Sequence, residues 1–72
     1  MITAQGVTES WNSEEGHGVV VADTGTEVWV HYSHLQGELR SLRPGQRVEI
    51  EWEPVVNQDG YQARAVHVRN PG

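Results

Sequence analysis

Apolar and polar residues alternate with a period of two along most of the chain, and glycine, asparagine, aspartate or proline interrupts the alternation. This pattern is typical of short β-strands joined by tight turns. It predicts five strands, at about residues 2–11, 17–22, 26–31, 48–53 and 61–69. Signals for α-helices are nearly absent, and only residues 33–39 indicate a short helical turn that runs into a loop.

Four segments between these strands contain residues that favour turns. They are residues 12–16, 23–25, 43–46 and 57–60. In the fourth strand, Val48, Ile50 and Trp52 alternate with three glutamates, which predicts one apolar face and one acidic face. Pro54 is expected to end this strand.

Five short strands without a substantial helix favour an all-β fold, a small barrel. Closing the barrel removes the exposed strand edges that an open sheet would leave. In the last strand, Val66 and Val68 are expected to face the interior. A length of 72 residues allows one domain, residues 1–72 with a tail at 70–72, and its core must be small.

The composition excludes several classes of site. The chain has no cysteine, so disulfides and thiolate metal sites are absent. No apolar run reaches the roughly 20 residues of a membrane span, and the N-terminus lacks the features of a signal peptide, so we expect a cytoplasmic protein without membrane contact. His31 and His34 supply only two imidazoles, and no orienting carboxylate accompanies His31 and Ser33. We therefore expect no metal, no cofactor, no catalytic residues and no enzymatic activity.

Charge is distributed unevenly along the chain. The first 39 residues contain six acids and no lysine or arginine, a net charge of −6, whereas the remaining residues carry +1, so the total is −5. Because phosphate backbones attract cations, this balance argues against strong nonspecific binding of nucleic acid.

A series of motifs resembles the cold-shock domain family. The motifs are Gly6-Val7, Trp11-Asn12, Glu15-Gly16-His17-Gly18-Val19-Val20, Val28-Trp29-Val30-His31-Tyr32-Ser33 and Leu42-Arg43-Pro44-Gly45-Gln46-Arg47-Val48. The family segments read roughly G-(I/V)-V-K-W-F-N, K-G-(F/Y)-G-F-I, V-F-V-H-(F/Y)-S and S-L-x-x-G-Q-x-V. Their order and spacing are matched over residues 5–69. The resemblance implies a five-stranded antiparallel OB-type barrel that binds single-stranded RNA or DNA, as an RNA chaperone or a regulator of gene expression.

The resemblance also implies a nucleic-acid site on the second and third strands and the adjoining loops. The side chains expected to stack bases or line the groove are Trp11, His17, Trp29, His31 and Tyr32. Asn12 is expected to hydrogen-bond a base or to shape the turn, and Arg40 is expected to contact phosphate. The strand pattern agrees for Trp29, because a residue between Val28 and Val30 faces away from the core if those valines face inward.

Several of the family's side chains are replaced at this site. Three aromatic positions of the family correspond to Ser10, Val19 and Leu39, and two of its lysines correspond to Glu9 and Glu15. Stacking contributes about 1–3 kcal/mol per base, and acidic side chains repel phosphate. We therefore predict weak binding, with a micromolar or higher dissociation constant.

Two of the four histidines are interpreted as binding residues and two as surface or edge residues. A free imidazole titrates near about 6.5, so acidification would add positive charge at His17 and His31. We predict that the affinity for an oligonucleotide rises as the pH falls from about 7.5 to 5.5. His34 and His67 are interpreted as ordinary surface or edge residues.

Two other functions remain open alternatives. In the first, a degenerate acidic barrel uses Trp11, Trp29 and Tyr32 as anchors for a protein partner, and its charge favours a basic one. In the second, the same patch mediates homodimerisation, so the chain is expected to be a monomer or a weak homodimer. Trp52 is interpreted as a core residue and Tyr61 as a packing residue at a solvent-exposed edge.

Overall fold

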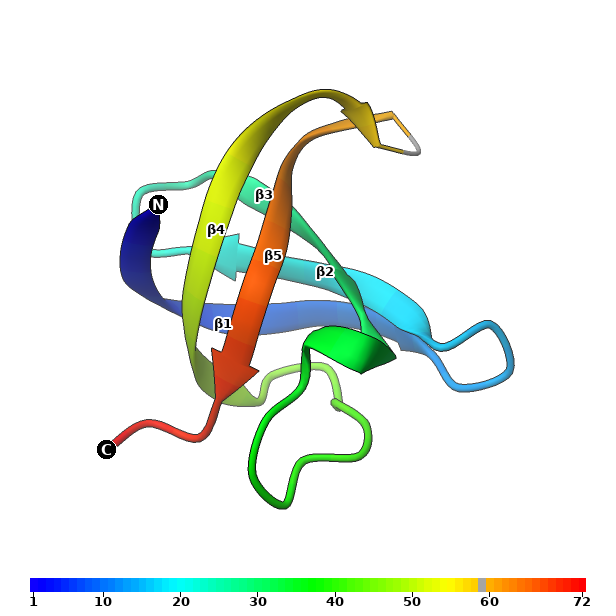
Figure 1. The fold of residues 1–72 in the computed structure, drawn as a ribbon. Helices are drawn as coiled ribbons and strands as arrows, with labels where there is room; N and C mark the ends of the chain where they lie inside the picture. Colours follow the sequence, from blue (N-terminus) through cyan, green and yellow to red (C-terminus); the bar gives the residue numbers. More distant parts are fainter. Residues whose placement is uncertain (59) are drawn as a thin grey trace.

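Each alternating segment of the sequence forms a strand in the computed structural model, which describes residues 1–58 and 60–72 (Figure 1). Within this part the strands are β1 (Ile2–Asn12), β2 (His17–Ala22), β3 (Glu27–His31), β4 (Arg47–Gln58) and β5 (Tyr61–Arg69). A 3-10 helix, η1 (Tyr32–His34), follows β3 directly. It is shorter than the helical turn expected there, and the strand boundaries agree with the prediction within a few residues except at the end of β4.

The strands close into a barrel in the order β1-β2-β3-β5-β4, with β4 pairing back onto β1. A closed barrel with an odd number of strands cannot alternate direction at every pairing. Here β3 and β5 run parallel, and the other pairings around the described barrel are antiparallel. The all-β barrel expected from the sequence is confirmed. Its closure places β5 beside β3, although the two strands lie far apart in the chain.

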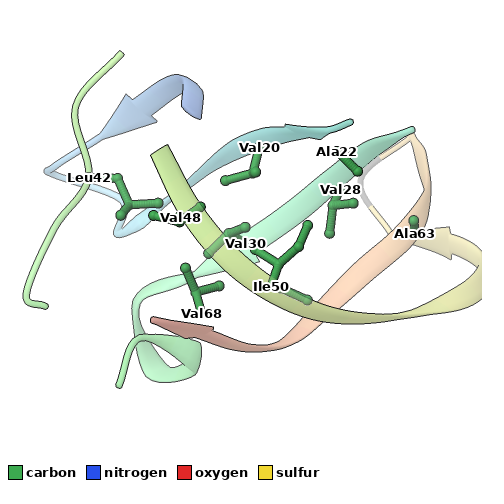
Figure 2. Close-up of a cluster of buried hydrophobic side chains, with 10 residues drawn as sticks. Val20, Ala22, Val28, Val30, Leu42, Val48, Ile50, Ala63 and Val68 are labelled. Carbon is green, nitrogen blue, oxygen red and sulfur yellow. The ribbon is translucent and has the colours of Figure 1, made fainter. Parts of the chain in front are cut away.

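Small aliphatic side chains fill the interior of the barrel (Figure 2). The buried cluster consists of Val20, Ala22, Val28, Val30, Leu42, Val48, Ile50, Ala63, Ala65 and Val68. Most of these residues occupy alternate positions of β2 to β5, so the period-two pattern maps onto inward-facing side chains. Trp52 is only half-buried and packs against the edge of this cluster, which makes it a peripheral part of the core.

The prediction that Pro54 ends the fourth strand is wrong. β4 continues through Pro54 to Gln58, and Pro54 pairs with Ala63 of β5. On its other side β4 pairs with β1 only as far as Trp52, opposite Ile2. Among the described residues no strand pairs with this edge of β4 beyond that point, so the missing N–H of proline interrupts no ladder of hydrogen bonds there. The extended pair of strands arches away from the barrel as an arm (Figure 1).

The prediction that Val66 faces inward is also wrong. Glu51 pairs with His67 and Trp52 pairs with Ala65, so Val66 is the extra residue of a β-bulge and is only half-buried. A bulge shifts the alternation by one position. The interior therefore receives Ala65 and Val68. The turn predicted at residues 57–60 includes Asp59, which lies outside the described residues.

Candidate nucleic-acid interface

Five ring side chains gather on one outer face of the barrel, and we call this set the ring platform. It consists of His17 from β2, Trp29 and His31 from β3, and Tyr32 and His34 from η1. Trp29 points outward because its neighbours Val28 and Val30 are fully buried. The register of β2 and β3 places His17 opposite His31, so both imidazoles flank the indole.

The rings of the platform lie close enough to form one continuous surface. The centroid of the Trp29 ring lies 5.8 Å from that of His17 and 5.9 Å from that of His31, and the His31 ring is nearly parallel to the indole, with an interplanar angle of 20°. His31 in turn lies 4.3 Å from Tyr32, whose side chain is exposed. Rings spaced in this way offer successive stacking faces to planar ligands.

Trp11 separates two hollows beside the platform. The first has a volume of about 290 Å³ and is lined by Ser10, Trp11, Asn12, His17, Gly18, Val19, Trp29 and Tyr61. The second has a volume of about 200 Å³ and is lined by Trp11, Ser13, Glu14, Glu15, Gly16, Tyr32, Arg40 and Ser41. The indole of Trp11 is half-buried and packs against the core, so it forms a fixed wall between the two hollows.

Two glycines allow the rings to reach these positions. A Cβ atom on Gly18 would overlap the carbonyl oxygen of Ser10 and lie 2.9 Å from Cα of Trp11. Gly16 has a φ of +74°, and a Cβ atom there would lie 2.6 Å from Cδ1 of Tyr32. Any other residue at either position would displace Trp11 or Tyr32, because such approaches leave no room for a side chain.

Hydrogen bonds around η1 orient two of the imidazoles. The backbone N–H of Ser33 donates to Nδ1 of His31 at 3.3 Å, and the Ser33 hydroxyl lies 2.9 Å from the same atom. The backbone N–H of His31 donates to Nδ1 of His34 at 3.2 Å. Burial, and then the positive charges of His31 and Arg64, hold the pKa of His34 below its ordinary value.

The residues expected at the site fall into three groups. His17, Trp29, His31 and Tyr32 are brought together on the platform, and Trp11 stands beside it. Asn12 lines the first hollow, but its Oδ1 accepts the N–H groups of Glu14 and Glu15 at 3.0 Å each. Of its two expected roles, that of shaping the turn is the one its contacts support. Arg40 lines the second hollow, and its guanidinium donates to the carbonyls of Gly37 and Leu39.

Two further ring side chains lie at the site, although the sequence did not assign them to it. His34, interpreted as an ordinary surface or edge residue, packs edge-on against Trp29 at a centroid distance of 6.3 Å. Tyr61, interpreted as a packing residue at a solvent-exposed edge, also lines the first hollow with Trp29 and Val19. Tyr61 reaches this hollow from β5, which pairs with β3, so no local signal could reveal its position.

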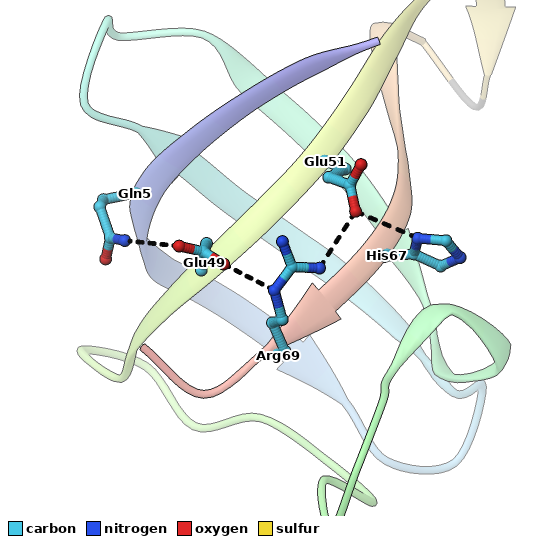
Figure 3. Close-up of polar contacts among 5 residues, drawn as sticks. All are labelled: Gln5, Glu49, Glu51, His67 and Arg69. Carbon is cyan, nitrogen blue, oxygen red and sulfur yellow. Dashed lines mark hydrogen bonds and ion pairs between the residues drawn. The ribbon is translucent and has the colours of Figure 1, made fainter. Parts of the chain in front are cut away.

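The outer faces of β4 and β5 carry a network of ion pairs (Figure 3). Arg69 donates from Nε to Glu49 at 2.6 Å and from Nη1 to Glu51 at 3.0 Å. Hydrogen bonds from Arg69 and then from His67 hold the pKa of Glu51 below its ordinary value. Hydrogen bonds to Glu51 and then to Glu49 raise the pKa of Arg69. Within the described residues, no group of three or more histidine, cysteine or acidic side chains is arranged to hold a metal ion.

Comparisons with known proteins identify the family. A model described as the 'Cold-shock' DNA-binding domain matches residues 4–69. The chain is 40% identical over 62 residues to cold shock-like protein CspLB of Listeria monocytogenes, covering 85% of this chain and 91% of that protein. It is 36% identical over 63 residues to cold shock protein CspB of Geobacillus stearothermophilus, covering 86% and 92% of the two chains. It is 37% identical over 71 residues to major cold shock protein CspA of Pseudomonas aeruginosa, covering 94% and 99%.

These matches agree with the structure. The helical part of the described chain is too short and too polar to cross a membrane. The barrel, the ring platform and the matched segment coincide over β1 to β5. The chain belongs to the cold-shock domain family, whose members bind single-stranded nucleic acid.

Proposed function

We propose that this chain binds single-stranded RNA or DNA weakly, by stacking bases on the ring platform and on Trp11. The observation that carries this proposal is the continuous set of rings around Trp29, which lies on the outer face of β3 between two imidazoles. Aromatic faces bind any base, so such a surface tolerates different sequences. A cytoplasmic role as an RNA chaperone or gene regulator, through binding and not catalysis, is part of the proposal, as is a single domain at residues 1–72.

The weakness of binding follows from what surrounds the platform. Val19 is only 5% exposed at the bottom of the first hollow, and Leu39 is half-buried against the core. Neither offers a flat face to a base, and each missing stacking contact costs about 1–3 kcal/mol. Glu14 and Glu15 line the second hollow and repel phosphate. These contributions support a micromolar or higher dissociation constant.

Arg40 is the proposed phosphate contact at the second hollow. Its guanidinium is exposed, and two backbone carbonyls hold it in the loop beside Tyr32. A guanidinium has five N–H donors, so donors remain for a phosphate while these carbonyl contacts persist. Arg40 therefore places a positive charge next to the most exposed ring of the platform.

Tryptophan fluorescence during titration with a pyrimidine-rich oligonucleotide tests this proposal. We expect quenching at low salt, weaker binding at moderate salt, and a loss of affinity of about five- to 140-fold in Trp29→Ala, since stacking contributes about 1–3 kcal/mol. Trp52→Phe is the matched control, because Trp52 lies outside the platform and both hollows beside it. Nanomolar affinity at physiological salt would contradict weak binding, and an absence of quenching at low salt would contradict binding itself.

A second candidate function is a protein interface on the same surface. It is favoured by the 58% exposure of Tyr32 and by the acidic residues near it. Exposed aromatic side chains commonly anchor protein interfaces, and the charge here suits a basic partner or a weak homodimer. If the oligonucleotide causes no quenching, light scattering of the chain alone and titration with a basic peptide decide between these partners.

A further inference from the structure

A row of paired residues crosses the outer face of the strands and ends in an ion pair. The register places Ser10 opposite Val19, Val19 opposite Trp29, Trp29 opposite Arg64, and Arg64 opposite Glu53. Paired residues of neighbouring strands point to the same side of a sheet. Arg64 therefore emerges beside the central indole of the ring platform, although β5 contributes no ring to it.

The guanidinium of Arg64 is held by a carboxylate at this position. Its Nη2 lies 2.5 Å from Oε1 of Glu53, and the two side chains are 41% and 38% exposed. Its neighbours Ala63 and Ala65 are buried, which confirms that Arg64 points outward. The charge of Arg64 also reaches His34 on the platform. Arg64 is thus a cation at the edge of the proposed binding surface, already paired with an anion of the same chain.

Resting on the proposed function, we propose that Arg64 is a phosphate-binding residue of the ring platform and that Glu53 competes with the nucleic acid for it. An ion pair between exposed side chains is weak, so a phosphate can displace the carboxylate. Guanidinium binds phosphate in a bidentate manner and also stacks on bases. While Glu53 is present, binding exchanges one anion for another, and Arg64 adds little to the affinity.

A matched control for a substitution of Glu53 is available at Glu49, on the same strand β4. Glu49 also lies on the outer face of β4, and it also accepts a hydrogen bond from an arginine of β5 (Figure 3). Its partner Arg69 is held by two carboxylates and lies outside the platform and its hollows. Glu49→Gln and Glu53→Gln change the net charge equally, so only the position relative to the platform differs.

The test is the affinity of the full chain for a pyrimidine-rich DNA oligonucleotide, measured by fluorescence over a range of salt concentrations. We expect Glu53→Gln to bind about fivefold more tightly at low salt. The slope of log affinity against log salt should steepen by about 0.7, the value for one additional phosphate contact on a single strand. Glu49→Gln should change neither quantity appreciably. In the Arg64→Gln background, Glu53→Gln should lose both effects.

Each alternative outcome has a defined meaning. The inference is overturned if Glu53→Gln and Glu49→Gln gain affinity equally. It is also overturned if the gain in affinity of Glu53→Gln persists in the Arg64→Gln background. Either result would mean that the effect comes from net charge alone. Binding by the wild type with no gain in Glu53→Gln rejects the competition alone, whereas no quenching in either protein rejects the proposed function. Thermal unfolding confirms the fold of each variant, and Glu53→Thr, which suits a strand, must reproduce the gain.

Discussion

Gly18 of β2 pairs with Trp11 of β1, and Gly18→Ala tests whether their close packing holds the site together. The new Cβ would overlap the Ser10 carbonyl oxygen and lie 2.9 Å from both Cα and Cε3 of Trp11. Backbone atoms cannot rotate away as a flexible side chain can. The strands must therefore separate, or the indole must leave its place between the two hollows.

The magnitude follows from two opposing contributions. Alanine restricts the unfolded chain more than glycine does, which stabilises the native state by about 0.5–1 kcal/mol. Overpacking in a closed interior costs about 1–3 kcal/mol, and contact with backbone places Gly18 at the upper end. We expect a net loss of about 2 kcal/mol. For a domain of this size, 1 kcal/mol shifts the melting temperature by roughly 4–8 °C, so the expected decrease is about 8–16 °C.

Thermal and urea unfolding followed by circular dichroism measure this loss. Gly25→Ala is the control, because a Cβ there meets nothing within 4 Å and only its φ of +91° is strained. That strain costs about 1–2 kcal/mol. Gly18 lies outside the left-handed region, so its cost is steric alone. A Gly18→Ala variant as stable as the wild type, with unchanged oligonucleotide affinity, would refute the reasoning.

Two further predictions concern pH. Because Arg69 and His67 lower the pKa of Glu51, the native state binds fewer protons than the unfolded chain in acid. The contribution of Glu51 to the free energy of unfolding is therefore fully present above its unfolded pKa. It is lost as the pH falls through the lower folded pKa. Urea unfolding between neutral and acidic pH should therefore show that the free energy of unfolding falls more steeply for the wild type than for Glu51→Gln. If the two proteins lose unfolding free energy equally as the pH falls, this contribution is excluded. Oligonucleotide affinity should rise as the pH falls from about 7.5 to 5.5, because an imidazole of the ring platform that gains a proton attracts phosphate. Flat affinity over that range, with the fold intact, would remove this idea.

The local pattern predicted those features that depend on neighbouring residues. The alternation of valine with Trp29 predicts an outward indole, and the structure places it there between buried valines. The turn residues separate the strands at nearly the observed positions. Side-chain alternation and turn preference are properties of the backbone over a few residues, so they can be inferred without knowledge of the rest of the chain.

The mistakes share a physical origin in pairing between strands. Pro54 is tolerated because β1 has already ended beside β4, and Val66 is displaced because the β4–β5 register contains a bulge. Neither the end of a partner strand nor an extra residue in a register is visible in the local alternation. The place of Tyr61 in the first hollow also depends on strand pairing, because β5 brings it beside Trp29.

By itself, the sequence determined that the chain is an all-β protein of short strands, with Trp29, His31 and Tyr32 on one outward segment. The motif order also carried the resemblance to its family. Only the tertiary structure decided which side chains of β5 join that segment, namely Tyr61 and Arg64, the latter with its partner Glu53. The reason is the parallel pairing of β3 with β5: a closed barrel with an odd number of strands requires one such pairing, and it joins residues that no local pattern connects.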